Sequence, residues 1–163
     1  MTQTASSKPR AILTMGVPAA GKSTVTAQRF PNLTVVDCDI FKPQHPKYDP
    51  KAITEEVHAW SQEQCQRALY AALGSGRDFV YDSTGTNAER MVEIIKQAQS
   101  AGFETVLVYV TVSLQTAIAR NNARARTVPE TILRQKYSTI NTSFEIVRNY
   151  ADVVEVINSE EAR

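Results

Sequence analysis

The chain has 163 residues, of which 42% are hydrophobic and 21% charged, and its formal net charge at pH 7 is +1. A chain of this length can bury one sizeable core, so we expect a flexible N-terminus over residues 1–10 and a single domain over residues 11–163. The balanced charge argues against attraction to long nucleic acids or anionic membranes, and no apolar run approaches the roughly eighteen residues of a membrane span. We therefore expect a cytoplasmic protein.

A short apolar run at residues 11–15 predicts the first strand, and residues 23–30 predict the helix after it. Between them, the sequence GVPAAGKST fits a phosphate-binding loop, in which backbone N–H groups surround the phosphates of a nucleotide. Lys22 can reach the β- and γ-phosphates, and the Ser23 hydroxyl can bind Mg²⁺. The nucleotide-binding residues that this pattern predicts are Gly16, Val17, Pro18, Ala19, Ala20, Gly21, Lys22, Ser23 and Thr24.

A second apolar run at residues 33–37 predicts a strand that ends at Asp37. Two prolines disfavour regular structure in residues 38–48, so we expect the polar groups there to face solvent or ligand. Asp39 is the candidate acid that orients or deprotonates an attacking hydroxyl, whereas Asp37 is expected to support the loop or Mg²⁺. A helix is expected from Asp49, as N-cap, and Pro50 to about residue 73.

The two cysteines, Cys38 and Cys65, are far apart in the sequence and show no metal-binding spacing. We therefore expect two reduced thiols, as is usual for a cytosolic protein, and no zinc site.

Residues 78–82 predict a third strand, which ends at Asp82. An acid at this position can hold a metal ion directly or through water. Thr86 and Glu89 have the spacing of a capping box and predict the start of the next helix. Ser83, Thr84 and Thr86 could contact a substrate or cap that helix, and the sequence leaves both readings open.

Residues 104–111 and 153–157 predict the fourth and fifth strands. Between them we expect a helix from Ser113 through Arg120 and Arg124, and a last helix that a capping box at residues 127–130 opens. Arg120 and Arg124 are four residues apart and would share one helix face, and Arg126 follows. These guanidinium groups predict a lid over the polyphosphate, with solvated surface arginines as the alternative.

Strands that alternate with helices predict an α/β fold, in which a parallel sheet carries helices on both faces. Ligands of such sheets bind at the carboxyl ends of the strands. The phosphate-binding loop, Asp37, Asp39 and Asp82 all follow strand ends, so we expect them to share one cleft.

The phosphate-binding loop and the segments VVDCDIFKPQHPKYD, YDSTGT and ARARTVPE resemble the zeta toxin kinases. This resemblance implies a P-loop kinase fold with five strands in the order 2-3-1-4-5, ATP and Mg²⁺ as cofactors, and an antitoxin-like protein partner. It implies that Asp39 is the catalytic base, Lys22 the phosphate-binding lysine, and Arg120 and Arg126 the lid arginines. Family members that phosphorylate UDP-N-acetylglucosamine carry Glu and Arg where this chain, aligned without gaps, has Gln66 and Thr86.

The segment DSTGTNAER also resembles small kinases related to polynucleotide 5′-kinases, and Asp39 and Lys42 fit the spacing of their Asp-x-x-Arg motif, with Lys for Arg. The substrate-binding candidates are Asp39, Lys42, Asp82, Thr84, Thr86 and Arg90, and the metal-binding candidates are Ser23 and Asp82.

We expect an ATP-dependent kinase that acts on a hydroxyl of a small nucleotide-like or sugar substrate. The first alternative is a kinase for nucleic acid 5′-hydroxyl ends. A nucleotide-binding switch or ATPase is the alternative from another class.

Overall fold

The computed structural model describes residues 8–124 and 127–160. Its strands are β1 (Arg10–Met15), β2 (Thr34–Asp37), β3 (Phe79–Asp82), β4 (Glu104–Thr111) and β5 (Val153–Asn158). Its α-helices are α1 (Lys22–Arg29), α2 (Glu55–Ser75), α3 (Ala88–Ser100), α4 (Leu114–Asn122) and α5 (Glu130–Val147), and two short 3₁₀ turns span Cys38–Ile40 and Lys42–Gln44. β1 begins at Arg10, one residue before the predicted first strand.

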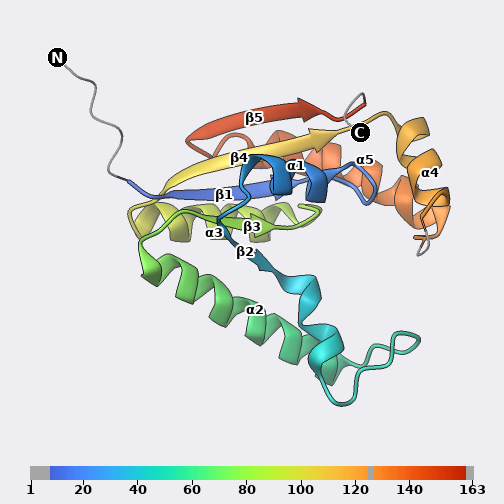
Figure 1. Ribbon diagram of the computed structural model, residues 1–163, viewed down its shortest axis with the longest axis horizontal. Coiled ribbons are helices and arrows are strands. Elements are labelled where there is room, and N and C mark those ends of the chain that lie inside the picture. Colours follow the sequence, from blue (N-terminus) through green and yellow to red (C-terminus); the bar gives the residue numbers. More distant parts are fainter. Residues whose placement is uncertain (1–7, 125–126, 161–163) are drawn as a thin grey trace.

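The five strands form one parallel sheet in the order β2-β3-β1-β4-β5 (Figure 1). This confirms the predicted fold class and strand order. β1 and β4 lie inside the sheet, and they carry nearly continuous runs of buried residues because helices cover both of their faces. The edge strands β2 and β5 are less buried.

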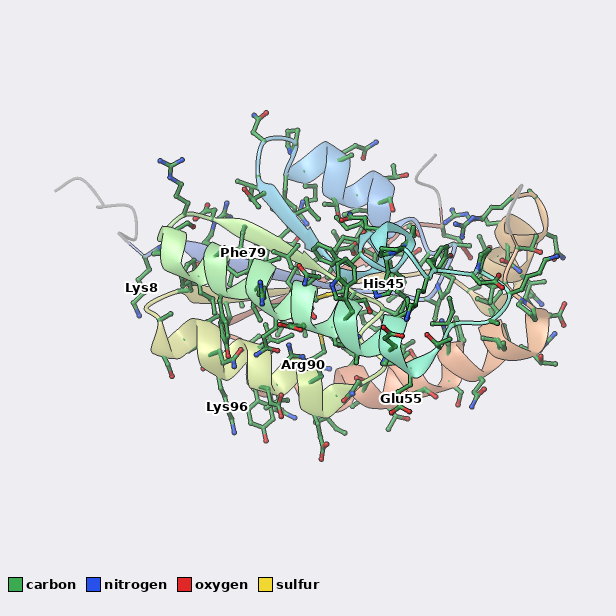
Figure 2. The ribbon with its side chains drawn as sticks, turned by 90° about the horizontal axis from the view of Figure 1, so that it is seen from below. Lys8, His45, Glu55, Phe79, Arg90 and Lys96 are labelled. Carbon is green, nitrogen blue, oxygen red and sulfur yellow. A yellow bond between two sulfur atoms is a disulfide. The ribbon has the colours of Figure 1, made fainter. Side chains whose placement is uncertain are left out.

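The helices form layers on the two faces of the sheet. Figures 1 and 2 show α1 on one face, α3 and α5 on the opposite face, and α2 along the β2 edge. Strand residues such as Ile12, Leu13 and Leu107 are fully buried and form one core with Ile94, Ile95 and Leu133 from the helices. Within residues 8–124 and 127–160, no helix has both the length and the hydropathy to cross a membrane.

Three helices begin at residues other than those predicted. The cap of α2 is Thr54, whose hydroxyl accepts the Val57 N–H, so the prediction of Asp49 as its cap was wrong. Asn87, rather than Thr86, caps α3 by accepting the Arg90 N–H. α5 begins after Pro129 without a side-chain cap. Each segment offers several polar caps, and packing of the helix decides between them.

The expectation of two reduced thiols was also wrong, because Cys38 and Cys65 form a disulfide in the structure. Cys38 follows β2, and Cys65 lies in α2, which packs along that strand. Their Cα atoms are 5.1 Å apart although the two cysteines are 27 positions apart in the sequence. Sequence spacing alone gives no sign of this proximity, because packing of α2 against β2 creates it.

The register of the sheet brings the strand ends together. Asp37 pairs with Asp82 in neighbouring strands, and Asp82 pairs with Thr14 of β1, which leads into the phosphate-binding loop. The carboxyl ends of β1, β2 and β3 therefore open onto one region of the molecule.

Candidate active site

The segment Gly16 to Thr24 connects β1 to α1 as a tight loop. Gly21 adopts a left-handed conformation with φ of 96°, and no side chain caps the helix that follows. The first helical hydrogen bond runs from the Val25 N–H to the Gly21 carbonyl, so the N–H groups that precede it lie at the positive end of α1. This arrangement suits a phosphate group, which needs donors and positive potential.

The surroundings of Gly16 leave little room for a side chain. A Cβ atom there would lie 3.0 Å from the Val110 carbonyl oxygen and 3.2 Å from Cγ of Lys22. The Gly16 N–H donates to the Thr84 carbonyl at 3.1 Å, which joins the loop to the turn after β3. A side chain at this position would therefore require the Val110 backbone or the Lys22 side chain to shift slightly.

Asp82 at the end of β3 is held by two neighbours. The Thr14 hydroxyl donates to its Oδ1 at 2.7 Å, and Lys22 Nζ lies 3.4 Å from the same oxygen. The side chains of Lys22 and Asp82 are 15% and 18% exposed. Both charges therefore face the cavity from a partly desolvated position.

Asp37 and Asp39 are two residues apart but occupy different environments. Asp37 is half-buried and accepts the Asp39 N–H at 3.0 Å. Burial raises its pKa above the ordinary value, and the carboxylates of Asp82 and Asp39 act in the same direction, against the Asp39 N–H and Lys22. The Asp39 side chain is exposed on the 3₁₀ turn beyond the strand, where a substrate can reach it.

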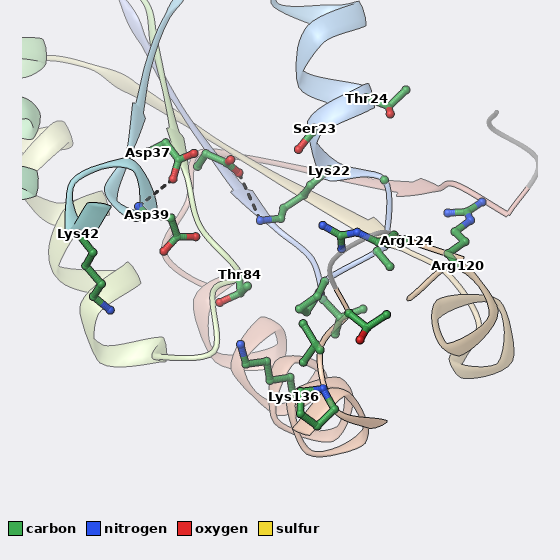
Figure 3. A pocket seen from close by; sticks show the side chains of 18 of the residues that line it. Lys22, Ser23, Thr24, Asp37, Asp39, Lys42, Thr84, Arg120, Arg124 and Lys136 are labelled. Atoms are coloured by element: carbon green, nitrogen blue, oxygen red, sulfur yellow. Dashed lines mark hydrogen bonds and ion pairs between the residues drawn. The ribbon is translucent and has the colours of Figure 1, made fainter. Parts of the chain in front are cut away.

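One cavity of about 960 Å³ joins the loop, the acids and the arginines. The predicted residues that line it are Val17, Pro18, Ala19, Gly21, Lys22, Ser23, Thr24, Asp37, Asp39, Lys42, Asp82, Thr84, Arg120 and Arg124. Figure 3 shows the labelled side chains around this space. The structure thus brings together residues that the sequence spreads over a hundred positions.

Thr86 and Arg90 are not among the residues that line the cavity. The Arg90 guanidinium donates to Gln66 of α2 at 3.2 Å and to Glu93 at 3.3 Å. The structure therefore places Arg90 between α3 and α2 rather than at the cavity.

Tyr81 lies buried near this contact, with its hydroxyl 3.6 Å from Sγ of Cys38 and 3.9 Å from Sγ of Cys65. Burial raises the pKa of the Tyr81 hydroxyl, and the positive charge of Arg90 opposes that shift. This phenol therefore stays protonated at neutral pH and can donate to sulfur.

Arg120 and Arg124 do not lie on one helix face as predicted. Helix α4 ends at Asn122, so Arg124 lies in the turn beyond it and does not share a helix face with Arg120. Arg120 donates to the Ser159 carbonyl at 2.7 Å and to the Ser159 hydroxyl at 3.2 Å. Arg126 lies outside the described residues.

Sequence reasoning missed several residues of the cavity. Ser159 follows β5, and its hydroxyl donates to the Ala20 carbonyl, which ties the end of the sheet to the phosphate-binding loop. Lys136 of α5 also lines the cavity, as does Ile53 of the loop before α2. No motif marks these residues, because only the packing of distant segments brings them to this place.

The donor set suits Mg²⁺, which prefers oxygen ligands and usually keeps several waters beside one or two carboxylates and substrate phosphates. The Ser23 hydroxyl and the Asp82 carboxylate line the same cavity. Within the described parts of the chain, no cluster of three or more His, Cys, Asp or Glu side chains could hold a metal by itself. Any Mg²⁺ at this site would therefore depend on phosphate oxygens and water for the rest of its ligands.

A protein-family model described as zeta toxin matches residues 1–163. The curated toxin zeta of Enterococcus hirae is 27% identical over 107 residues, which cover 60% of this chain and 37% of that protein. The match therefore spans little more than a third of the length of this relative.

Two solved structures share the fold. The structure reported for the PezAT chromosomal toxin–antitoxin system of Streptococcus pneumoniae has a TM-score of 0.70 and 17% identity, and the match covers 94% of this chain and 69% of that chain. A chain of the Pnkp1/Rnl/Hen1 RNA repair complex has a TM-score of 0.72 and 12% identity, over 85% of this chain and 46% of that chain.

Proposed function

Because the chain belongs to the zeta toxin family, we propose that it is an ATP-dependent kinase that phosphorylates a hydroxyl group of a small nucleotide-like or sugar molecule. The observation that carries this proposal is the single cavity that contains both the phosphate-binding loop and the exposed Asp39. Phosphoryl transfer requires a phosphate cradle and an acid near the attacking hydroxyl, and the cavity offers both.

In this proposal, the loop N–H groups and Lys22 bind the β- and γ-phosphates of ATP. Ser23 and Asp82 hold Mg²⁺, which neutralises charge on the phosphate oxygens when it is bound. Thr14 fixes the Asp82 carboxylate by a hydrogen bond of 2.7 Å. Arg120 and Arg124 stabilise the charge that develops on the transferring group, and Ser159 positions Arg120.

Asp39 orients the acceptor hydroxyl and takes its proton as the oxygen–phosphorus bond forms and the bond between the β,γ-bridging oxygen and the γ-phosphorus breaks. ADP leaves with the bridging oxygen. We assign this role to Asp39 rather than Asp37, because the Asp37 carboxylate already accepts the Asp39 N–H and is less accessible. Thr84 lines the same part of the cavity and is proposed to contact the acceptor, together with Lys42.

The same proposal includes a single domain over residues 11–163, because all five strands belong to one sheet. It also includes a cytoplasmic place of action, where ATP is available, and an antitoxin-like partner, by likeness to the toxin–antitoxin system of Streptococcus pneumoniae.

The experiment incubates the protein with γ-labelled ATP and Mg²⁺ and offers UDP-sugars, nucleosides, free sugars and 5′-hydroxyl oligonucleotides in parallel. We expect label to move to a small acceptor, and Asp39→Asn to lower kcat by about a hundredfold or more while ATP affinity is retained. Asp78→Asn is the matched control, because Asp78 pairs with Arg10 before β3, at the opposite end of that strand from Asp82.

Transfer to the oligonucleotide alone would favour the 5′-kinase alternative. Equal release of free phosphate by the wild type and Asp39→Asn, with no acceptor labelled, would refute the kinase proposal and favour a switch or ATPase.

A further inference from the structure

The connection between α4 and α5 contributes to the lining of the cavity. Its described residues that do so are Arg124, Thr127, Val128 and Pro129. Arg120, just before this connection, is held by its own side chain, whose guanidinium donates to the Ser159 and Ala20 carbonyls. The Arg124 guanidinium instead forms no hydrogen bond or ion pair with any group in residues 8–124 and 127–160. The backbone that carries Arg124 must therefore decide where its side chain lies in the cavity.

Asn121, in the last turn of α4, is a buried polar residue that is only 1% exposed. Its Nδ2 donates to the Val128 carbonyl at 2.6 Å, and its Oδ1 accepts the Val128 N–H at 2.9 Å. The side-chain amide thus pairs with the backbone of one residue through both a donor and an acceptor. Asparagine is a weak helix former, and a buried polar group is costly unless it is hydrogen-bonded. This amide pairing therefore accounts for an asparagine at this position.

Asn121 holds the connection at both of its ends. Its backbone carbonyl accepts the Arg124 N–H at 3.2 Å, and its side chain binds Val128, seven positions further along the chain. Directly after Val128, the Pro129 carbonyl accepts the Leu133 N–H, and Leu133 is fully buried in the core. Loss of the side-chain amide would therefore release the connection at Val128, and the backbone that carries Arg124 would sample more positions.

We propose that Asn121 is a positioning residue, which holds Arg124 over the transferring phosphoryl group by closing the connection between α4 and α5. This inference rests on the proposed kinase function, in which Arg124 stabilises the charge that develops during transfer. Asn121 does not itself line the cavity, so it acts through Arg124 rather than on the substrate. ATP binds mainly through the phosphate-binding loop, which Asn121 does not contact.

The first test measures phosphoryl transfer by Asn121→Ala. We expect kcat to fall by about tenfold to a hundredfold, because a small displacement of a group that stabilises the transition state is enough for such a loss. KM for ATP should change by less than about threefold, since the interaction is needed in the transition state rather than for binding. A rise in KM for ATP with kcat unchanged would overturn the inference.

Asn121→Leu separates the loss of the amide from the loss of packing. Leu fills the buried space but cannot pair with the Val128 backbone, so kcat should fall as far as in Asn121→Ala. Recovery of kcat in Asn121→Leu would show that packing alone matters and would refute the inference. Asn149→Ala is the matched control, because the Asn149 side chain also donates to a backbone carbonyl at a helix end, at 2.9 Å, but lies outside the cavity. Its kinetic constants should equal those of the wild type.

A double-mutant cycle tests whether Asn121 acts through Arg124. Arg124→Gln should lower kcat, and adding Asn121→Leu to Arg124→Gln should lower it by less than about twofold more. Full additivity of the two losses would mean that Asn121 acts by another route, and it would contradict the inference.

Amide exchange followed by nuclear magnetic resonance tests the hydrogen bonds without any reaction. The Val128 N–H should exchange at least about tenfold faster in Asn121→Leu than in the wild type, whereas the core amide of Leu107 should not change. Equal exchange at Val128 in both proteins would refute the inference.

Calorimetry with Mg²⁺, ADP and aluminium fluoride, which mimics the transferring phosphoryl group, tests the role of Asn121 without turnover. Asn121→Leu should weaken binding of this complex by about tenfold, while binding of Mg²⁺ and ADP alone stays the same. This result would support the inference even if no acceptor is ever labelled, and the kinase proposal alone would then fail. Equal affinity of both proteins for the fluoride complex would refute the inference.

Discussion

At the scale of single residues, three aspartate side chains of the site have the same chemistry but different surroundings. Asp37 and Asp82 are the last residues of β2 and β3, and Asp39 lies two residues beyond β2. Thr14 and Lys22 contact Asp82, the Asp39 N–H contacts Asp37, and the side chain of Asp39 is exposed. In the proposed kinase, the Asp82 carboxylate faces metal and phosphate, and the Asp39 carboxylate faces the acceptor.

Asp37 gives a prediction about stability. Burial raises the pKa of Asp37 above the ordinary 3.8. The contribution of this carboxyl group to the free energy of unfolding is therefore fully present below pH 3.8, and it is lost as the pH rises through the folded-state pKa. Asp37→Asn should therefore be more stable than the wild type at pH 7, and the difference should shrink toward pH 3.8. Asn still offers an oxygen to the Asp39 N–H.

Urea unfolding of both proteins between pH 4 and pH 8 measures this difference. A wild type that is more stable than Asp37→Asn at pH 7 would contradict the inference that partial burial of the Asp37 carboxylate destabilises the folded protein.

At the scale of elements, the turn between β3 and α3 connects the core to the phosphate-binding loop. Thr84 accepts the Gly16 N–H, and the carbonyl of Gly85 accepts the Ser143 hydroxyl of α5. Gly85 has φ of 81°, and a Cβ atom there would lie 2.6 Å from Cγ of the fully buried Met15. The turn therefore requires glycine both for its backbone conformation and for space.

Gly85→Ala should lower the free energy of unfolding by about 2 kcal/mol or more, from left-handed strain and overpacking together. It should also weaken ATP binding, because Thr84 would move with the turn. Gly74→Ala is the control, since Gly74 lies in α2 with no atom within 4 Å of an added Cβ, and it should stabilise by up to about 1 kcal/mol. Denaturant unfolding of the wild type, Gly85→Ala and Gly74→Ala measures these opposite changes in the free energy of unfolding. Equal stabilities of the three proteins would contradict the prediction.

At the scale of the whole molecule, the Cys38–Cys65 disulfide links the segment that carries Asp39 to α2. The two cysteines are 27 positions apart, and the loop that the disulfide closes contains the 3₁₀ turns and the first half of that helix. A covalent link of this kind stabilises mainly by restricting the unfolded chain.

Reduction of the disulfide should lower the free energy of unfolding by about 3.5 kcal/mol according to the chain-entropy account. Urea unfolding with and without reductant measures this effect, and thiol titration establishes which samples contain the bond. Cys65→Ala without reductant should unfold close to the reduced wild type. Identical midpoints for oxidised and reduced wild type would show that the bond does not contribute.

The sequence by itself determined the α/β class, the five strands to within one residue at either end, and the identity of the phosphate-binding loop. These features depend on local patterns: apolar runs specify strands, and the spacing of Gly16, Gly21 and Lys22 specifies the loop. The strand order came from a family resemblance rather than from local pattern.

The tertiary structure alone decided the features that depend on distant segments. Lys136 and Ser159 reach the cavity because α5 and β5 pack beside the loop, and Arg90 lies away from it because α3 turns its side chain toward Gln66. The disulfide and the raised pKa of Asp37 arise in the same way. Local sequence encodes which elements form, but proximity and burial are properties of their packing.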